Sequence, residues 1–328
     1  MNALREKYQR IAVLVPLLDS DPGAPADRPI GRAALQLAGE GVDVLFVNAA
    51  RGGRVSGFRA VGSQWQPVTD VTVAAAYDRY PSQSDPSGYA RLKAGLGSIP
   101  IANPMALTLL CRDKIRTQEV LQSVPMPEVI TDPARFESAV SEWGEAFSKP
   151  RYGAFGRGVR RVVPGDLVPA RGEGAVPGVD EPLFLQRAVT PLAPYAGVSV
   201  RVLCQRTGPQ EWRAWMPAVR RSMTDPVVNA SRGAEVISGA EAFPELVAKL
   251  QELSLRCCRI LSQQPGGELF LEAGVDCVID AHRQPWVIEV NGHPRGRLEA
   301  LAGQSPVEYA AQHLEACARP FRYLAERK

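Results

Sequence analysis

The sequence predicts an α/β protein with an N-terminal α/β domain, followed by two regions, a middle and a last lobe, in which helices and strands are mixed. The chain has 328 residues, 45% of them hydrophobic and 22% charged, which suffices for two or three domains with buried cores. Apolar runs of period two, typical of strands, are interspersed with segments whose apolar residues recur at helical spacing. No internal repeat or low-complexity segment interrupts this pattern.

The first domain is predicted to span residues 1–103. Residues 11–18 (IAVLVPLL) read as an apolar strand, and a loop rich in Pro, Asp and Gly follows them. Residues 32–41 have helical spacing, and residues 42–48 (VDVLFVN) form a second strand. This β-loop-α-β order is the start of an α/β layer.

The middle lobe is predicted to span residues 104–185. Helical spacing predicts one helix over residues 105–123, beginning near a proline, and another over residues 132–147. A strand ending at Pro150 follows. Residues 164–182 are rich in Gly and Pro and are expected to form a surface loop.

The last lobe is predicted to span residues 186–328. Its strands come from period-two alternation and its helices from amphipathic spacing. Strands are expected over 183–189, 198–205 and 211–222, a long helix over 244–262, a hairpin over 275–291, and a final helix near 306–324.

Composition and charge narrow the class of protein. The net charge is only +3, and arginine is spread along the chain, so the sequence predicts no nucleic-acid partner. The N-terminus lacks an apolar signal core and no apolar run approaches about 18 residues, which predicts a cytoplasmic protein without a membrane partner. The six cysteines have no metal-ligand spacing and are expected to be reduced core residues.

The predicted hairpin carries polar residues where an apolar sheet is expected. In the simplest register Asp276 faces Glu289, and Asn291 lies two residues along on the same face. Two opposed carboxylates repel each other and destabilise a sheet unless positive charge lies between them. A hard divalent cation would remove that conflict, whereas a purely structural hairpin would have to bury unpaired carboxylates.

A glycine-rich segment follows Lys149. Gly153, Gly156 and Gly158 allow the backbone to turn and to present N–H groups to an anion, and a neighbouring lysine is a common phosphate partner. A plain hairpin explains the same composition. The spacing matches neither the P-loop nor the Rossmann pattern.

The order of these segments resembles the ATP-grasp superfamily over about residues 103–300. The resemblance implies the ATP-grasp fold, with two α+β lobes (residues 104–185 and 186–328) after an N-terminal α/β domain. The matching segments are CRDKIRTQEVL, SKPRYGAFGRG, SVRVL, NASRGAE and GVDCVIDAHRQPWVIEVNGHPRG. Two segments, YDRYPSQ (residues 77–83) and WVIEVNGHPRG, are similar to the endospore-coat-associated branch. Asp78 stands where that branch carries asparagine.

The resemblance implies a set of site residues. Asp276, Glu289 and Asn291 match positions that hold Mg²⁺ on the nucleotide, and Lys114 and Lys149 match the lysines that contact phosphates. Solvated charges are the alternative for both lysines. The resemblance assigns the phosphate and acyl-phosphate site to Arg201, Arg232 and Asn229, and the nucleotide base and ribose to Gln186 and to backbone groups of Arg187, Ala188 and Val189.

The resemblance also implies an activity. The expected protein is an ATP- and Mg²⁺-dependent ligase that joins a carboxylate to an amine, on a small molecule or peptide, through an acyl phosphate. His293, Arg295 and Arg297 are candidates for substrate contact, although a solvated turn explains them equally well. A phosphotransferase of the same fold and a nucleotide-binding coat or assembly protein without turnover are the alternatives. A homodimer is compatible with this architecture.

Overall fold

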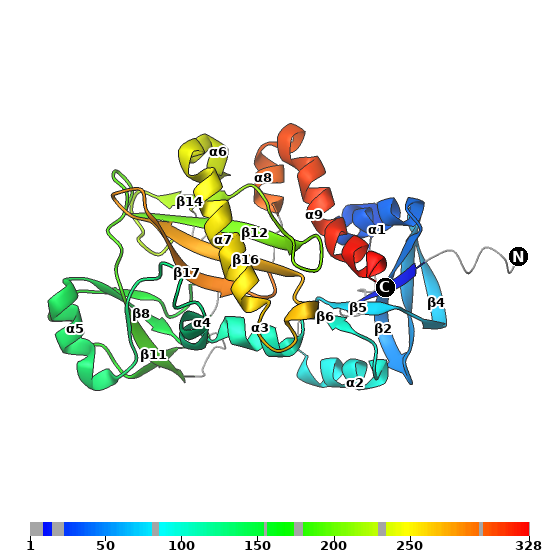
Figure 1. The fold of residues 1–328 in the computed structure, drawn as a ribbon, viewed down its shortest axis with the longest axis horizontal. Helices are drawn as coiled ribbons and strands as arrows, with labels where there is room; N and C mark the ends of the chain where they lie inside the picture. The colour runs from blue at the N-terminus through cyan, green and yellow to red at the C-terminus, as the bar shows by residue number, and fades with distance from the viewer. Residues whose placement is uncertain are drawn as a thin grey trace, which may run out of the picture.

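Three β-sheets follow one another along the chain in the computed structural model (Figure 1). The third sheet lies between the other two. The structure describes residues 9–14, 23–80, 85–153, 156–173, 180–228, 234–294 and 298–327.

The first sheet has six strands in the order β4-β3-β2-β1-β5-β6. Its β1, β2, β5 and β6 run parallel, while β3 and β4 return as antiparallel neighbours of β2. The β-loop-α-β start predicted from sequence is confirmed, with α1 between β1 and β2. The elements are β1 (Gln9–Leu14), α1 (Pro29–Gly39), β2 (Val42–Arg51), β3 (Arg54–Val61), β4 (Gln64–Thr72), β5 (Ala75–Asp78), α2 (Pro86–Leu96) and β6 (Ile101–Ala102).

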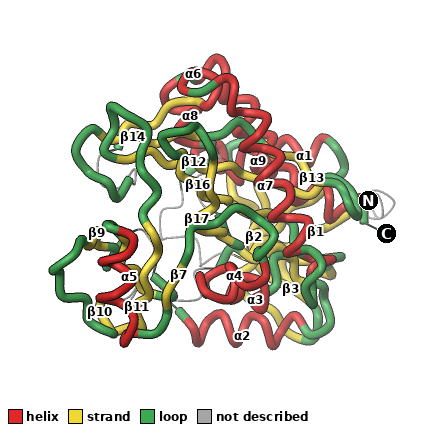
Figure 2. The backbone as a smooth tube through the Cα atoms, turned by 60° about the vertical axis from the view of Figure 1, so that its left-hand side comes forward, coloured by secondary structure: helices red, strands yellow, loops and turns green. Residues whose placement is uncertain are grey.

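The second sheet forms a lobe of its own beside the third (Figure 2). The helix predicted over 132–147 is shorter, because Gly144 takes a left-handed conformation (φ 74°) that ends it. The loop predicted over 164–182 is wrong in part, since β10 pairs with β11 inside it. The elements are β7 (Val129–Ile130), α5 (Phe136–Trp143), β8 (Ala146–Pro150), β9 (Arg160–Val162), β10 (Arg171–Glu173) and β11 (Asp180–Arg187).

The third sheet is antiparallel, in the order β15-β14-β12-β16-β17, with β13 beside β12. Alternate residues of β12 and β16 pack against α7 in one apolar core, which includes Cys204, Cys257, Cys258 and Cys277. All six cysteines are buried and none is in a disulfide. The elements are β12 (Gly197–Arg206), β13 (Trp212–Ala214), β14 (Ala218–Ser222), β15 (Glu235–Ser238), α6 (Gly239–Ala242), α7 (Val247–Leu261), β16 (Glu272–Ile279) and β17 (Pro285–Asn291).

The single helix predicted over 105–123 is wrong. Two helices, α3 (Met105–Arg112) and α4 (Lys114–Val120), meet at Asp113, whose backbone has left the helical region (φ −80°, ψ 95°). The Asp113 carboxylate caps α4 by accepting from the Arg116 N–H at 3.2 Å. Both helices pack against β17.

The chain ends on the first sheet. Helices α8 (Glu299–Gln304) and α9 (Pro306–Glu326) follow the hairpin, and α9 lies beside α1 (Figures 1 and 2). Phe321 and Leu324 of α9 share a core with Ile11 and Leu37. The final helix therefore completes the core beneath the first sheet. The residue limits expected for the three domains stay a prediction.

In the described part of the chain, no helix combines the length and the apolar character that crossing a membrane requires.

Candidate active site

A cavity of about 890 Å³ lies where the three sheets meet. Each sheet contributes side chains to its lining: Arg79 comes from the first, Lys149 and Gln186 from the second, and Arg201 and Glu289 from the third. This volume is within the range of pockets that hold cofactors and drug-sized ligands.

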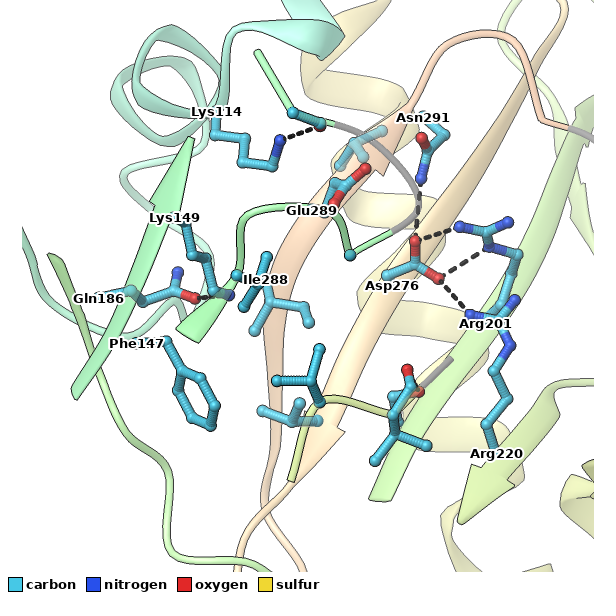
Figure 3. A pocket seen from close by; sticks show the side chains of 18 of the residues that line it. Lys114, Phe147, Lys149, Gln186, Arg201, Arg220, Asp276, Ile288, Glu289 and Asn291 are labelled. Atoms are coloured by element: carbon cyan, nitrogen blue, oxygen red, sulfur yellow. Dashed lines mark hydrogen bonds and ion pairs between the residues drawn. The ribbon is translucent and has the colours of Figure 1, made fainter. Parts of the chain in front are cut away.

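The acidic hairpin pairs Asp276 with Glu289 as expected from the sequence, but a bulge between Asp276 and Cys277 shifts the register toward the turn by one residue. Asp276 on β16 pairs with Glu289 on β17, and Asn291 lies two residues further along β17, opposite Gly274. The Asn291 amide nitrogen donates to Asp276 Oδ2 at 2.9 Å. The three side chains therefore converge on one wall of the cavity (Figure 3).

The positive charge beside Asp276 comes from the protein itself. Arg201 donates through Nε to Asp276 Oδ1 at 2.8 Å and through Nη2 to Oδ2, and Arg220 Nη1 lies 3.8 Å from Oδ1. Burial by itself would lower the pKa of Arg201, but the Asp276 carboxylate outweighs burial and raises it. The opposed acids therefore do not need a metal ion to offset their repulsion, because Arg201 already neutralises Asp276.

Glu289 is the more available carboxylate. No hydrogen bond or ion pair joins it to another residue in the described ranges, although its charge raises the pKa of both Lys149 and Arg201. In Figure 3 the two lysines lie on one side of Glu289, and the two arginines lie beyond Asp276 on the other. Its free oxygens face the space between them.

The donor set suits a magnesium ion that arrives with phosphates. The described residues contain no cluster of three or more His, Cys, Asp or Glu side chains that could hold a metal alone. Glu289, the oxygen of Asn291 and the shared carboxylate of Asp276 offer hard oxygen ligands. Mg²⁺ is commonly bound in this way, by one or two carboxylates together with substrate phosphates.

Two lysines face the acids across the cavity. Lys149 on β8 donates from Nζ to Gln186 Oε1 on the neighbouring β11, and Lys114 at the start of α4 donates to the Gly153 carbonyl. Burial lowers the pKa of Lys149 to about 8, Glu289 opposes this shift, and Lys114 adds to it. Lys149 is therefore a half-buried cation that an anionic ligand would stabilise.

The glycine-rich segment is only partly at the cavity. Gly153 and Gly156 line it, whereas Gly158 does not. Gly156 and Gly158 have backbone φ angles of 70° and 67°, which residues other than glycine rarely adopt. The turn thus requires glycine at two positions, and residues 154–155 lie outside the described ranges.

The three residues that follow Gln186 do not all reach the cavity. Arg187 and Val189 line the cavity and Ala188 does not. The N–H of Arg187 donates to the Glu128 carbonyl at 2.9 Å, and that of Ala188 to the Glu145 carbonyl at 3.1 Å. These two N–H groups are already engaged within the fold, so they are not available to a nucleotide.

Of the remaining predicted site residues, the structure describes one. His293 lines the cavity. Asn229, Arg232, Arg295 and Arg297 lie outside the described residues.

Arg220 and Arg79 are among the cavity residues that were not predicted. The alternation on β14 could have identified Arg220, because Val219 is buried beside Val200 and the next residue must face the other side, with Arg201. Its neighbour Arg221 instead pairs with Glu235 at 2.6 Å. Arg79 stands in the segment YDRYPSQ, which was matched as a whole without a role for the arginine, and it reaches the cavity from the end of β5.

The three sheets, the acidic hairpin and the clamp-like cavity define the ATP-grasp fold. Similar solved structures cover nearly the whole chain. The VanG D-Ala:D-Ser ligase of Enterococcus faecalis matches with a TM-score of 0.58 and 13% identity, over 97% of this chain and 98% of that one. The ATP-grasp ligase PsnB, complexed with a minimal precursor, matches with 0.57 and 16%, over 94% and 98%. N5-carboxyaminoimidazole ribonucleotide synthetase of Thermotoga maritima matches with 0.54 and 14%, over 95% and 76%.

At the level of sequence, the model of the YheC/D-like ATP-grasp family matches residues 183–325. This segment contains β12, β14, β16 and β17, and hence the acidic hairpin and its two arginines. No curated protein matches the chain in sequence.

Proposed function

We propose that this protein is an ATP- and Mg²⁺-dependent ligase that joins a carboxylate to an amine through an acyl phosphate. The observation that carries the proposal is the wall formed by Asp276, Glu289 and Asn291, facing Lys114 and Lys149 across one cavity. The ligase names of structures with the same fold, VanG and PsnB among them, support it.

The nucleotide occupies the lysine side of the cavity. Lys149 and Lys114 bind phosphate oxygens, and the Lys149 ammonium leaves Gln186 to do so, which frees the Gln186 amide for the ribose or base. The glycine turn covers the phosphates and excludes water, which protects an acyl phosphate from hydrolysis.

Glu289, Asn291 and Asp276 hold the metal against those phosphates. When bound, Mg²⁺ supplies charge neutralisation on the phosphate oxygens. Arg201 holds the Asp276 carboxylate in place through its two hydrogen bonds.

The reaction has two displacements. A substrate carboxylate oxygen attacks the γ-phosphorus, the bond to the β,γ-bridging oxygen breaks, and ADP leaves. The amine then attacks the acyl carbon, loses a proton, and expels phosphate. Arg201, and Arg232 from the segment outside the described residues, stabilise the negative charge of the acyl phosphate.

The proposal is tested by ADP release from Mg-ATP in mixtures of acids and amines. Ligation requires both substrates and gives an amide, whereas a phosphotransferase gives a stable phosphorylated product from one acceptor. A nucleotide-binding assembly protein of the endospore-coat type binds Mg-ATP without release of ADP. Absence of any magnesium-dependent affinity for ATP would refute all three.

Glu289→Gln tests the metal role directly. The variant keeps the shape of the side chain and removes its charge, so we expect turnover to fall by at least about 100-fold with an unchanged melting temperature. Glu137→Gln, on the exposed face of α5, is the matched control and keeps full activity. Equal activity of Glu289→Gln and wild type would remove Glu289 from the metal site.

A further inference from the structure

Arg79 is placed where the first sheet meets the cavity. It directly follows β5, whose parallel neighbours β1 and β6 end at the same edge of the sheet. Ligands of α/β sheets commonly bind at such carboxyl edges. Of the described residues before Asn103, only Arg79 and Tyr80 line the cavity.

A buried carboxylate fixes one end of the Arg79 guanidinium. Glu272 on β16 is fully buried and accepts from Arg79 Nη1 at 3.0 Å, from Gln205 Nε2 at 2.9 Å and from the Tyr77 hydroxyl. A buried carboxylate requires several hydrogen-bond donors, and Glu272 receives them from the first and the third sheet. Arg79 is therefore held in one orientation.

The same nitrogen makes the second contact. Arg79 Nη1 also donates to the Pro294 carbonyl at 2.8 Å, three residues after Asn291. No hydrogen bond to a described residue engages Nε or Nη2, although only 12% of the side chain is exposed. A planar guanidinium anchored by one nitrogen thus keeps a second edge that no described residue engages, and the residue lines the cavity.

We propose that Arg79 binds a substrate carboxylate that does not react, so that the first sheet selects the substrate. The inference rests on the ligase function proposed above. Two adjacent N–H donors of one plane match a carboxylate. Because Glu272 already shares the charge of Arg79, a singly charged carboxylate suits the site better than a phosphate dianion, and a cation is repelled.

The substrate class follows from this chemistry. Either the acid substrate is a dicarboxylic acid or the amine substrate is an amino acid or peptide with a free carboxylate. In both cases one carboxylate remains on Arg79 while the bond forms near Glu289.

Binding to the full chain, saturated with Mg²⁺ and a non-hydrolysable ATP analogue, tests the proposal. The probes are dicarboxylates from malonate to adipate with their diamides, and alanine and glutamate with their α-amides. We expect at least one acid to bind and its amide to bind much more weakly. Arg79→Ala should weaken the acid by about 10- to 100-fold and leave the ATP analogue unaffected, since a charged hydrogen-bond pair is lost.

Three further variants separate binding from folding. Arg79→Lys keeps a cation for Glu272 but loses the planar edge, so it also weakens the acid. Tyr77→Phe removes a donor to Glu272 and lowers the melting temperature without changing the affinity for the acid. Arg51→Ala, an exposed arginine at the end of β2, changes neither.

Two results overturn the inference: acids that bind Arg79→Ala as well as wild type, or a wild-type protein that binds the ATP analogue but none of the acids. Failure to bind the analogue at all instead refutes the proposed function.

Discussion

Burial makes Lys149 a weak cation in the absence of a ligand. Its pKa is lowered to about 8 from its usual value of 10.5, so near neutral pH it is charged but easily deprotonated. In the window between pH 8 and 10.5 the unfolded chain holds a proton that the folded chain has lost. Folding stability from this residue therefore rises with pH across that window. Binding of a polyphosphate favours the opposite, protonated state.

This conflict predicts a pH-dependent affinity for nucleotide. The Kd of Mg²⁺ with a non-hydrolysable ATP analogue should increase by about tenfold from pH 7 to pH 9, because the bound state must recapture a proton. Lys149→Arg stays charged throughout and should flatten the dependence. Isothermal titration at the two pH values measures both. A wild-type affinity that does not change with pH would show that Lys149 does not carry the phosphates.

The Lys149 site also connects to the metal wall. Glu289 raises the pKa of Lys149, so Glu289→Gln should move the midpoint of that pH dependence to a lower pH. The side chains on the two walls of the cavity therefore influence one another before any ligand binds.

At the scale of elements, the break between α3 and α4 ties a helix start to the cavity. Asp113 caps α4 and receives Nε and Nη2 of Arg151, at the end of β8, at 2.8 and 2.7 Å. The next residue, Lys114, begins α4 and donates to the Gly153 carbonyl. Asp113 and Lys114 thus connect α3 and α4, which pack against the third sheet, to the glycine-rich turn after β8.

Two substitutions at Asp113 separate its roles. Asparagine retains the cap but loses the charge pair, whereas alanine loses both. We expect Asp113→Asn to lower the free energy of unfolding by about 1 kcal/mol, because Arg151 is partly exposed and solvent screens the pair. Asp113→Ala should cost about 1 kcal/mol more. Urea denaturation measures the difference, and equal losses would mean that the cap contributes nothing.

At the scale of the whole molecule, Glu272 joins the first and third sheets. Its donors come from β5 and β12 and from Arg79, and the Gln205 amide also reaches the Ala316 carbonyl in α9 at 2.7 Å. Trp215 donates to Gln205 Oε1 at 2.8 Å. These buried polar groups satisfy one another, which makes the junction rigid.

Removal of this carboxylate should loosen the junction. Glu272→Ala leaves Arg79 without its partner, and we expect a loss of about 3 kcal/mol in stability and separate unfolding of the two sheets in calorimetry. Glu268→Ala, an exposed acid nearby, is the control. A single transition at the wild-type temperature would show that apolar packing by α9 suffices to join them.

Sequence patterns predicted the local elements well where one period dominates. The β16–β17 hairpin follows from alternation and a short turn, and the β1–α1–β2 start follows from a change of period. The pairing of Asp276 with Glu289 also needs the bulge between Asp276 and Cys277, which alternation does not predict. The patterns failed where a contact between residues far apart in sequence determines where a helix ends. Helical spacing continues through Asp113, yet the bond from Arg151 and the cap on α4 end the first helix there.

The sequence by itself determined that Glu289 and Asn291 share one face of β17, because strand periodicity is a local property of the chain. Only the tertiary structure decided what surrounds them. A bulge in the hairpin brings Asp276 opposite Glu289. Arg201 and Arg220 come from neighbouring strands, Lys114 from α4, Lys149 from the second sheet and Arg79 from the end of β5 in the first. The order of strands and the packing of sheets depend on contacts between residues far apart in sequence, which no local period encodes.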